Sequence, residues 1–289
     1  RPKVLVDNLR VASGDLYDER NVQKTYTYFG RLSALKYTNI RFFETQNGDS
    51  TQLNCYVMLT KSKHKSISFE LEGTNSAGDL GAAASVSFQH RNLFRGSETF
   101  MVKFRGAYEA ISGLQPGYKH HNYTEYGVET SINFTHFLFP FLTSDFKRRI
   151  KATTEFGLQD NYQLRPEFSR TIASASWSYK WIQKQKIQHR IDLLDISYLY
   201  LPWISSQFQE DYINKDKDNY ILKYNYENRL IVRMGYNYSY NSAGGTLVNN
   251  TITTNSYSIR AGFESAGNLL YGISKMINMR KNTDGEYAI

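Results

Sequence analysis

SISFELEGTNSAGDLGAAASVSFQHRNLFRGSETFMVKFRGAYEAIS, residues 66–112, is the stretch that decides the fold. Apolar and polar side chains alternate along it in three runs, which begin near Ser66, Ala84 and Phe100. Because successive strand residues point to opposite faces of a sheet, each run predicts an antiparallel strand with one apolar and one polar face. Such strands fit a half-buried soluble sheet, or a membrane barrel that has lipid outside and water inside.

The composition excludes helices that span a membrane but permits strands that do. The chain has 289 residues, including 23 Tyr and 17 Phe, and its mean hydropathy is −0.54. It contains no run of about 18 apolar residues, which a spanning helix needs. A spanning strand is apolar only at every second position, so this polar average leaves a barrel open. The net charge of +8 is dispersed along the chain and does not predict a nucleic-acid partner.

Residues 1–62 predict a small α+β module. Asp18 and Glu19 open an amphipathic helix of roughly 13–15 residues. A shorter helix precedes it, and two strands follow at 37–44 and 52–60. We expect a first strand of this module upstream of Arg1, and we expect the chain to be a piece of a longer protein.

From residue 63 onward the helical period disappears and strands dominate. Alternation predicts nine strands, at about 66–73, 84–89, 100–109, 124–139, 149–162, 170–181, 188–203, 230–240 and 251–264. Most of them have roughly 10–14 residues, whereas strands of soluble sheets usually have about five or six. This length favours strands that cross a membrane.

Two further patterns favour a membrane barrel. Short turns at 95–97, 143–147 and 183–186 alternate with longer connections at 113–122 and 205–228, as periplasmic turns alternate with extracellular loops. Charged side chains keep to one face of the predicted strands, where a wet lumen would solvate them: Lys103, Arg105, Glu129, Lys151, Glu155, Arg233 and Arg260. The sequence therefore predicts a mainly β protein, in which an α+β module precedes part of an antiparallel transmembrane β-barrel.

Three motifs are distinctive: Gly14-Asp15-Leu16-Tyr17, Gly78-Asp79-Leu80-Gly81 and Arg91-Asn92-Leu93-Phe94-Arg95-Gly96-Ser97-Glu98. Together with the module that precedes the strands, they resemble the BamA/TamA superfamily of outer-membrane barrel insertases, and TamA-like members in particular. The resemblance implies that residues 1–62 are the last polypeptide-transport-associated (POTRA) domain, incomplete at its N-terminus. It implies that residues 63–289 are the N-terminal half of the barrel, with about nine of an expected sixteen strands. The barrel would lie in the bacterial outer membrane and the POTRA domain in the periplasm.

The resemblance also implies a function in outer-membrane protein assembly, insertion or translocation, by β-strand pairing at a lateral seam of the barrel. The first barrel strand would pair with a client strand through Ser66, Ile67, Ser68, Phe69, Glu70, Leu71, Glu72 and Gly73. The POTRA domain would feed clients through a groove that comprises Asn21, Lys24, Thr25, Tyr37, Asn39 and Arg41. The family-like turn motif comprises Arg91, Asn92, Leu93, Phe94, Gly96 and Glu98.

We expect no enzymatic activity, no cofactor and no metal site. The single cysteine, Cys55, has no partner for a disulfide, and the predicted lumen carboxylates balance nearby positive charges. The expected partners are unfolded outer-membrane or secreted client proteins, outer-membrane lipid or lipopolysaccharide, and a periplasmic or inner-membrane protein that binds the POTRA domain. Two alternatives stay open: a secretion pore of the two-partner type, and a porin-like channel.

Overall fold

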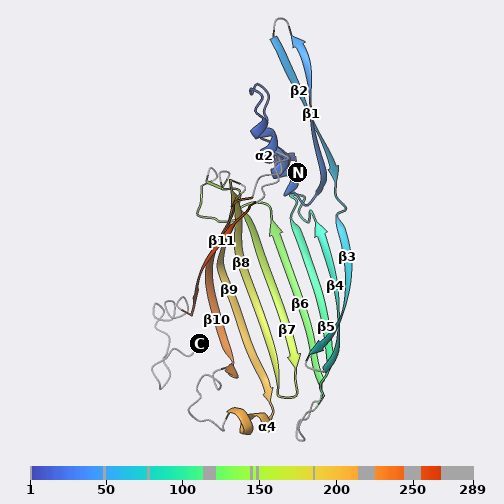
Figure 1. The fold of residues 1–289 in the computed structure, drawn as a ribbon, viewed down its shortest axis with the longest axis vertical. Coiled ribbons are helices and arrows are strands. Elements are labelled where there is room, and N and C mark those ends of the chain that lie inside the picture. The colour runs from blue at the N-terminus through green and yellow to red at the C-terminus, as the bar shows by residue number, and fades with distance from the viewer. Residues whose placement is uncertain are drawn as a thin grey trace.

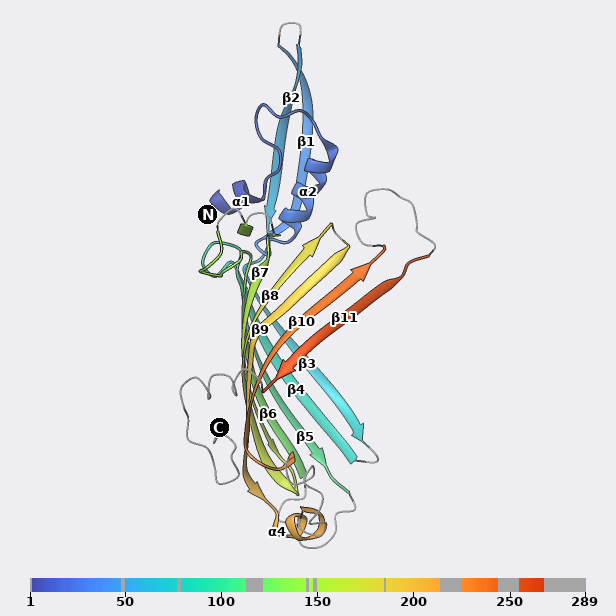
Figure 2. The same cartoon turned by 90° about the vertical axis from the view of Figure 1, so that its left-hand side faces the viewer.

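The computed structural model describes residues 2–47, 50–76, 79–112, 122–143, 146–147, 150–184, 186–213, 225–243 and 255–267. The described chain has two parts, a small N-terminal part with helices and a large antiparallel sheet (Figure 1). The N-terminal part lies at the end of the sheet where the first long strand begins (Figures 1 and 2).

Two helices begin the chain. α1 spans Pro2–Asn8 and α2 spans Glu19–Gly30. Asp18 caps α2, because its side chain accepts a hydrogen bond from the backbone N–H of Arg20. The apolar side of α2 faces inward, and Phe29 on it is only 2% exposed. No helix in the described part of the chain is both long and apolar enough to cross a membrane.

A β-hairpin follows the helices. β1 (Leu35–Asn47) and β2 (Ser50–Lys61) pair with each other in a two-stranded antiparallel sheet. α2 packs on β1, where the Tyr26 hydroxyl accepts the backbone N–H of Ile40 at 2.9 Å. The predicted order of helix, helix, strand, strand is confirmed, and both strands are longer than predicted. The assignment of these elements to a POTRA domain stays a prediction.

Nine antiparallel strands form the large sheet, and each pairs with its neighbours in sequence. They are β3 (Lys65–Ser76), β4 (Asp79–Arg91), β5 (Thr99–Ala110), β6 (Asn122–Phe134), β7 (Thr153–Leu164), β8 (Phe168–Gln183), β9 (Ile187–Ile204), β10 (Arg229–Asn241) and β11 (Ser258–Ala266). After β9, a short helix α4 (Ser206–Phe208) runs into a π-helical turn (Gln209–Ile213). The nine predicted strands are confirmed. The described sheet is open, with β3 and β11 at its two edges.

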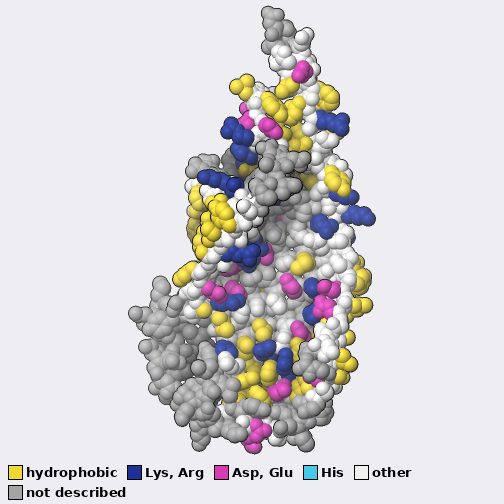
Figure 3. All heavy atoms as spheres, viewed as in Figure 1, with side chains coloured by type: hydrophobic (Ala, Val, Ile, Leu, Met, Phe, Trp, Pro, Cys, Tyr) yellow, Lys and Arg dark blue, Asp and Glu magenta, His cyan; other side chains and the backbone are white. Residues whose placement is uncertain are grey.

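The sheet is curved, and both of its edges bend toward the same side (Figure 2). Figure 3 looks onto the concave face, where acidic and basic side chains lie scattered among uncharged polar ones, with some hydrophobic side chains between them. The apolar residues that alternate with them point to the convex face and are largely exposed. Examples are Phe69 (76% exposed), Phe104 (55%) and Leu158 (62%). The sheet is therefore polar inside and apolar outside, as the alternation predicted.

The connection between β6 and β7 corrects one prediction. The sequence predicted a strand as far as residue 139 and a short turn at 143–147, but β6 ends at Phe134 and β7 begins at Thr153. The residues that directly follow β6 contact β7 and β8. The Leu138 N–H donates to Thr154 Oγ1, and the Tyr179 hydroxyl donates to the Leu138 carbonyl, both at 2.9 Å. A short turn lies instead at 165–167, at the opposite end of the sheet, so long and short connections do not strictly alternate.

A β-bulge in β9 changes which side chains face inward. Asp192 and Asp195 each pair with a residue of β10. The two residues of β9 that lie between them stand opposite a single residue of β10. Both aspartates therefore lie on the concave face, although they are an odd number of residues apart. Each forms an ion pair with an arginine there, Arg190 with Asp192 at 2.7 Å and Arg233 with Asp195 at 2.6 Å.

Candidate functional site

The hydrogen-bond pattern of β4 fixes the direction of the backbone groups in its neighbours. In an antiparallel pair, alternate residues of a strand bond to the strand on one side, and the residues between them bond to the other side. The Arg91 N–H donates to the His64 carbonyl, and the Asn92 N–H donates to the Glu98 carbonyl, both at 2.6 Å. Odd-numbered residues of β4 therefore bond to β3, and even-numbered residues bond to β5.

This pattern determines what β3 presents at its outer edge, the edge that does not face β4. The register between β3 and β4 is unbroken from Lys65 to Ser76, and even-numbered residues of β3 stand opposite odd-numbered residues of β4. Even-numbered residues of β3 therefore bond to β4. The N–H and C=O groups that point to the outer edge belong to Ile67, Phe69, Leu71 and Gly73. No strand in the described part of the chain pairs with that edge.

All eight residues predicted to pair with a client strand lie on β3: Ser66, Ile67, Ser68, Phe69, Glu70, Leu71, Glu72 and Gly73. Their side chains divide between the two faces of the sheet. Ile67, Phe69 and Leu71 lie on the convex face and are 62%, 76% and 85% exposed. Glu70 and Glu72 lie on the concave face. The strand thus combines an apolar outer surface with a backbone edge that no strand of the described residues pairs, and such an edge is a template for adding another strand.

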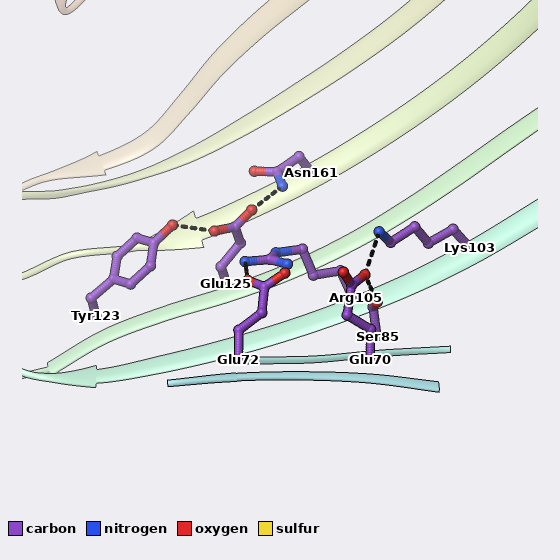
Figure 4. A network of polar contacts seen from close by, with 8 residues as sticks. All are labelled: Glu70, Glu72, Ser85, Lys103, Arg105, Tyr123, Glu125 and Asn161. Carbon is purple, nitrogen blue, oxygen red and sulfur yellow. Dashed lines mark hydrogen bonds and ion pairs between the residues drawn. The ribbon is translucent and has the colours of Figure 1, made fainter. Parts of the chain in front are cut away.

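A polar network covers the concave face from β3 to β7 (Figure 4). On β3, Glu70 binds Lys103 of β5 and Glu72 binds Arg105 of β5. Farther along the sheet, Glu125 accepts hydrogen bonds from the Tyr123 hydroxyl and from Asn161 Nδ2, the latter at 2.6 Å. The acidic side chains in this network therefore have hydrogen-bond donors as neighbours.

The turn between β4 and β5 is built around a buried carboxylate. Glu98 is 3% exposed, and its Oε2 accepts the backbone N–H groups of Phe94 (3.1 Å) and Gly96 (2.8 Å). The side chain of Asn92 accepts the N–H of Ser97 at 2.9 Å. A Cβ at Gly96 would lie 2.2 Å from Glu98 Oε1, so a larger residue here would displace the carboxylate. The six residues of the family-like motif, Arg91, Asn92, Leu93, Phe94, Gly96 and Glu98, all lie at or in this turn.

The same turn holds the N-terminal part of the chain. Ser97 Oγ accepts the backbone N–H of Ala34 at 2.9 Å, and Ser33 Oγ donates to the Ser97 carbonyl at 2.8 Å. Thr135, which follows β6, donates to the Gly96 carbonyl at 2.9 Å. Residues 33–34 connect α2 to β1, so the turn fastens the α2–β1 corner to the end of the large sheet.

Lys151 makes a second contact between the two parts. The sequence predicted it on a lumen-facing strand, but it precedes β7 and has a left-handed backbone with φ of 51°. Its Nζ donates to the Asp7 carbonyl at 3.0 Å and to Asn8 Oδ1 at 3.2 Å. It also lies 3.8 Å from the centre of the Tyr28 ring, a cation–π contact. We call the contacts of Ser33, Ala34, Ser97 and Lys151 the joint.

The joint should depend on pH through Lys151. Burial, together with the positive charges of Arg10 and Arg31, lowers the pKa of Lys151 to about 8 against a smaller opposing effect of Asp7. We call the N-terminal part docked when the contacts of the joint are made. Above this pH the docked state binds fewer protons than the undocked state, so raising the pH favours docking. From pH 7 to pH 9 we expect the docked fraction to rise in the wild type and to stay constant in Lys151→Met.

Spin labels on the exposed residues Lys24 and Ile182, in a Cys55→Ser background, would measure the docked fraction. Lys184→Met is the matched control, because Lys184 is also a left-handed lysine at this end of the sheet but is exposed. It should keep the wild-type pH dependence. A docked fraction that falls with rising pH in the wild type would contradict the prediction.

The residues predicted to form a client groove do not share one surface. Thr25 is completely buried, and its hydroxyl accepts the Arg10 N–H and donates to the Asn21 carbonyl. Its inclusion was wrong, because the hydroxyl is used inside the N-terminal part. Asn21 is half-buried. The other four residues are exposed on α2 and β1: Lys24, Tyr37, Asn39 and Arg41.

The structure has a different concave surface in this region, which the sequence did not indicate. A cavity of about 800 Å³ lies between the loop 9–18, the start of α2 and β2. Its walls include apolar side chains of both strands and the loop, among them Leu16, Phe42, Leu53 and Val57. Asn21 is the residue of the predicted groove that lines this cavity. The cavity forms because the loop returns over the hairpin, a contact that local sequence patterns do not reveal.

Within the described ranges, no three His, Cys, Asp or Glu side chains lie close enough together to hold a metal ion. Two carboxylates of the concave face have basic partners: Glu155, which was predicted in the lumen, binds Lys180 at 2.5 Å, and Asp192 binds Arg190. These two carboxylates therefore serve as ion-pair partners on the concave face.

Comparisons with known proteins bear on the fold. No protein-family model matches the sequence, and no curated protein sequence is significantly similar to it. A solved structure does match: the crystal structure of BamA from Haemophilus ducreyi lacking POTRA domains 1–3, with a TM-score of 0.50 and 14% sequence identity. The match covers 92% of this chain and 46% of that chain, so this chain spans about half the length of its structural relative. The chain therefore has a BamA-like β-barrel fold, present in its described residues as an open sheet of nine strands.

Proposed function

We propose that this chain is part of an outer-membrane protein assembly factor, which inserts client proteins by pairing their β-strands with β3. The single observation that supports this most is the outer edge of β3, with its row of backbone donors and acceptors. A client strand that adds to this edge gains main-chain hydrogen bonds that lipid cannot supply. The process requires no covalent chemistry, no cofactor and no metal ion.

The faces of β3 suit this role. A client strand that continues the sheet would place its apolar side chains beside Ile67, Phe69 and Leu71, toward lipid, and its polar side chains toward the concave face. The BamA-like fold agrees with a barrel in the bacterial outer membrane. The proposed partners are therefore unfolded β-barrel clients and the surrounding lipid or lipopolysaccharide.

The N-terminal part would lie in the periplasm and deliver clients to the barrel as a POTRA domain. Its joint with the β4–β5 turn sets it beside the start of β3. The cavity between the loop 9–18 and β2 has both polar and apolar walls and is lined by successive residues of β2, which fits an extended client segment. A periplasmic or inner-membrane partner would bind the same part from outside.

Reconstitution tests the proposal. The intact protein that contains this chain would be placed in liposomes and mixed with a urea-unfolded porin as the client. We expect folding of the porin, followed by its resistance to protease, to be at least about tenfold faster than in empty liposomes, because hydrogen-bonded pairing lowers the cost of placing an unpaired strand in lipid. Ion conductance without faster folding would instead identify a channel, and export of a soluble partner would identify a secretion pore.

A further inference from the structure

Two ion pairs connect strands that are not neighbours in the sheet. Lys103 Nζ of β5 binds Glu70 Oε2 of β3 at 3.3 Å, and Arg105 Nη2 of β5 binds Glu72 Oε2 of β3 at 2.9 Å. Both pairs pass over β4. In each pair, the glutamate on β3 lies two residues closer to the β3–β4 turn than the residue of β3 that stands directly across from the basic residue. Figure 4 shows the four side chains on one side of the sheet, above the strand that separates them.

Small side chains on β4 make room for these pairs. The inward positions of β4 beneath them are Ala83 and Ser85, which stand opposite Glu72 and Glu70. Each is only 5% exposed. Strands β3 and β5 are separated by two strand spacings, about 10 Å, which long basic side chains can cross only if nothing large stands between them. Ser85 adds to the contact, because its hydroxyl donates to Glu70 Oε2 at 3.2 Å.

An edge strand needs such support. Within the described sheet, β3 has a backbone partner on one side only, whereas every strand from β4 to β10 has partners on both sides. A strand with one partner frays more readily, and fraying would disorder the row of backbone N–H and C=O groups at its outer edge. The two ion pairs restrain β3 through side chains on the concave face. They therefore leave unused the outer N–H and C=O groups of Ile67, Phe69 and Leu71.

We propose that Lys103 and Arg105 are positioning residues, which hold β3 extended and in register from the concave side so that its outer edge can accept a client strand. The proposal rests on the proposed function of that edge. The pairs are partly exposed, with side-chain exposures between 31% and 57%, so each contributes modestly. The combined effect of the two ion pairs is concentrated on β3.

Charge exchange tests the proposal in the intact protein in proteoliposomes. In Glu72→Arg and in Arg105→Glu, we expect deuterium exchange of the β3 amides to be about fivefold faster and insertion of an unfolded porin to be slower by a similar factor. The double variant E72R/R105E restores the ion pair with reversed charges, and both quantities should return to within about twofold of the wild type. A purely local packing defect would not be rescued in this way.

A second pair of variants tests the passage over β4 without changing any charge. Ala83→Leu places a large side chain under the ion pairs, whereas Ala84→Leu places the same side chain on the exposed convex face. We expect faster β3 exchange in Ala83→Leu and wild-type exchange in Ala84→Leu.

The outcomes separate the two proposals. If the wild type does not accelerate porin folding, the proposed function fails, while β3 exchange still tests the restraint. If β3 exchange is the same in wild type, single variants and Ala83→Leu, the ion pairs do not hold the strand and the inference is wrong. It is also wrong if exchange changes as expected while insertion stays at the wild-type rate, or if the charge-exchanged double variant rescues neither.

Discussion

Phe69→Pro should reduce client insertion by more than about tenfold while the β3–β4 pairing stays intact. Phe69 is an odd-numbered residue of β3, so its N–H points to the outer edge and not to β4. Proline removes this donor and is tolerated at edge positions whose N–H faces away from the sheet. An incoming strand would then leave a carbonyl unpaired in lipid, at a cost of several kcal/mol.

Two control variants make this result specific. Ser68→Pro removes a donor that bonds to β4, so it should destabilise the barrel itself, which the gel mobility of the folded form would report. Phe69→Ala removes the exposed ring but keeps the N–H, and it should insert clients at nearly the wild-type rate. If Phe69→Pro folds and inserts the unfolded porin as fast as Phe69→Ala, the outer edge of β3 is not where clients pair.

The sequence predicted the strands of the sheet well because their signal is local. Apolar and polar residues alternate over most of β5 and β8 and over the first part of β3, and a period of two is visible within a single strand. The same alternation separated the two faces of the sheet correctly. These features depend on the strand itself and on the difference between water and an apolar medium, so no distant contact is needed to predict them.

Features that depend on distant contacts could not be predicted. β6 ends at Phe134 because the following segment bonds to Thr154 and Tyr179, which come from two later strands. Thr25 is buried because α1 and its loop return over α2, which the helical pattern of α2 does not show. The bulge in β9 did leave a trace, because Asp192 and Asp195 lie three residues apart in a strand whose charged residues otherwise keep one parity.

The joint illustrates a site that was half predicted. The family-like motif, which includes Gly96 and Glu98, indicated the β4–β5 turn through its resemblance to the superfamily. The partners of that turn, Ser33 and Ala34, lie more than sixty residues earlier and form no motif. The sequence therefore identified the turn but not what it holds.

Replacing Glu98, the buried carboxylate of the β4–β5 turn, should cause a large loss of stability. Glu98→Ala leaves the buried N–H of Gly96 and the part-buried N–H of Phe94 without their acceptor, and an unsatisfied buried donor costs about 1–3 kcal/mol. We expect the free energy of unfolding, measured by urea titration, to fall by about 2–4 kcal/mol. Gly96→Ala should lower it as well, because the added Cβ displaces the same carboxylate.

The controls for this experiment distinguish the turn from a general effect of charge. Glu98→Gln keeps one acceptor oxygen and should recover part of the loss, whereas Glu44→Ala removes an exposed carboxylate from β1 and should change the free energy of unfolding by less than about 0.5 kcal/mol. Because Ser97 belongs to the same turn, Glu98→Ala should also broaden the distance between spin labels at Lys24 and Ile182. A variant as stable as Glu44→Ala, with an unchanged label distance, would mean that the carboxylate does not organise the joint.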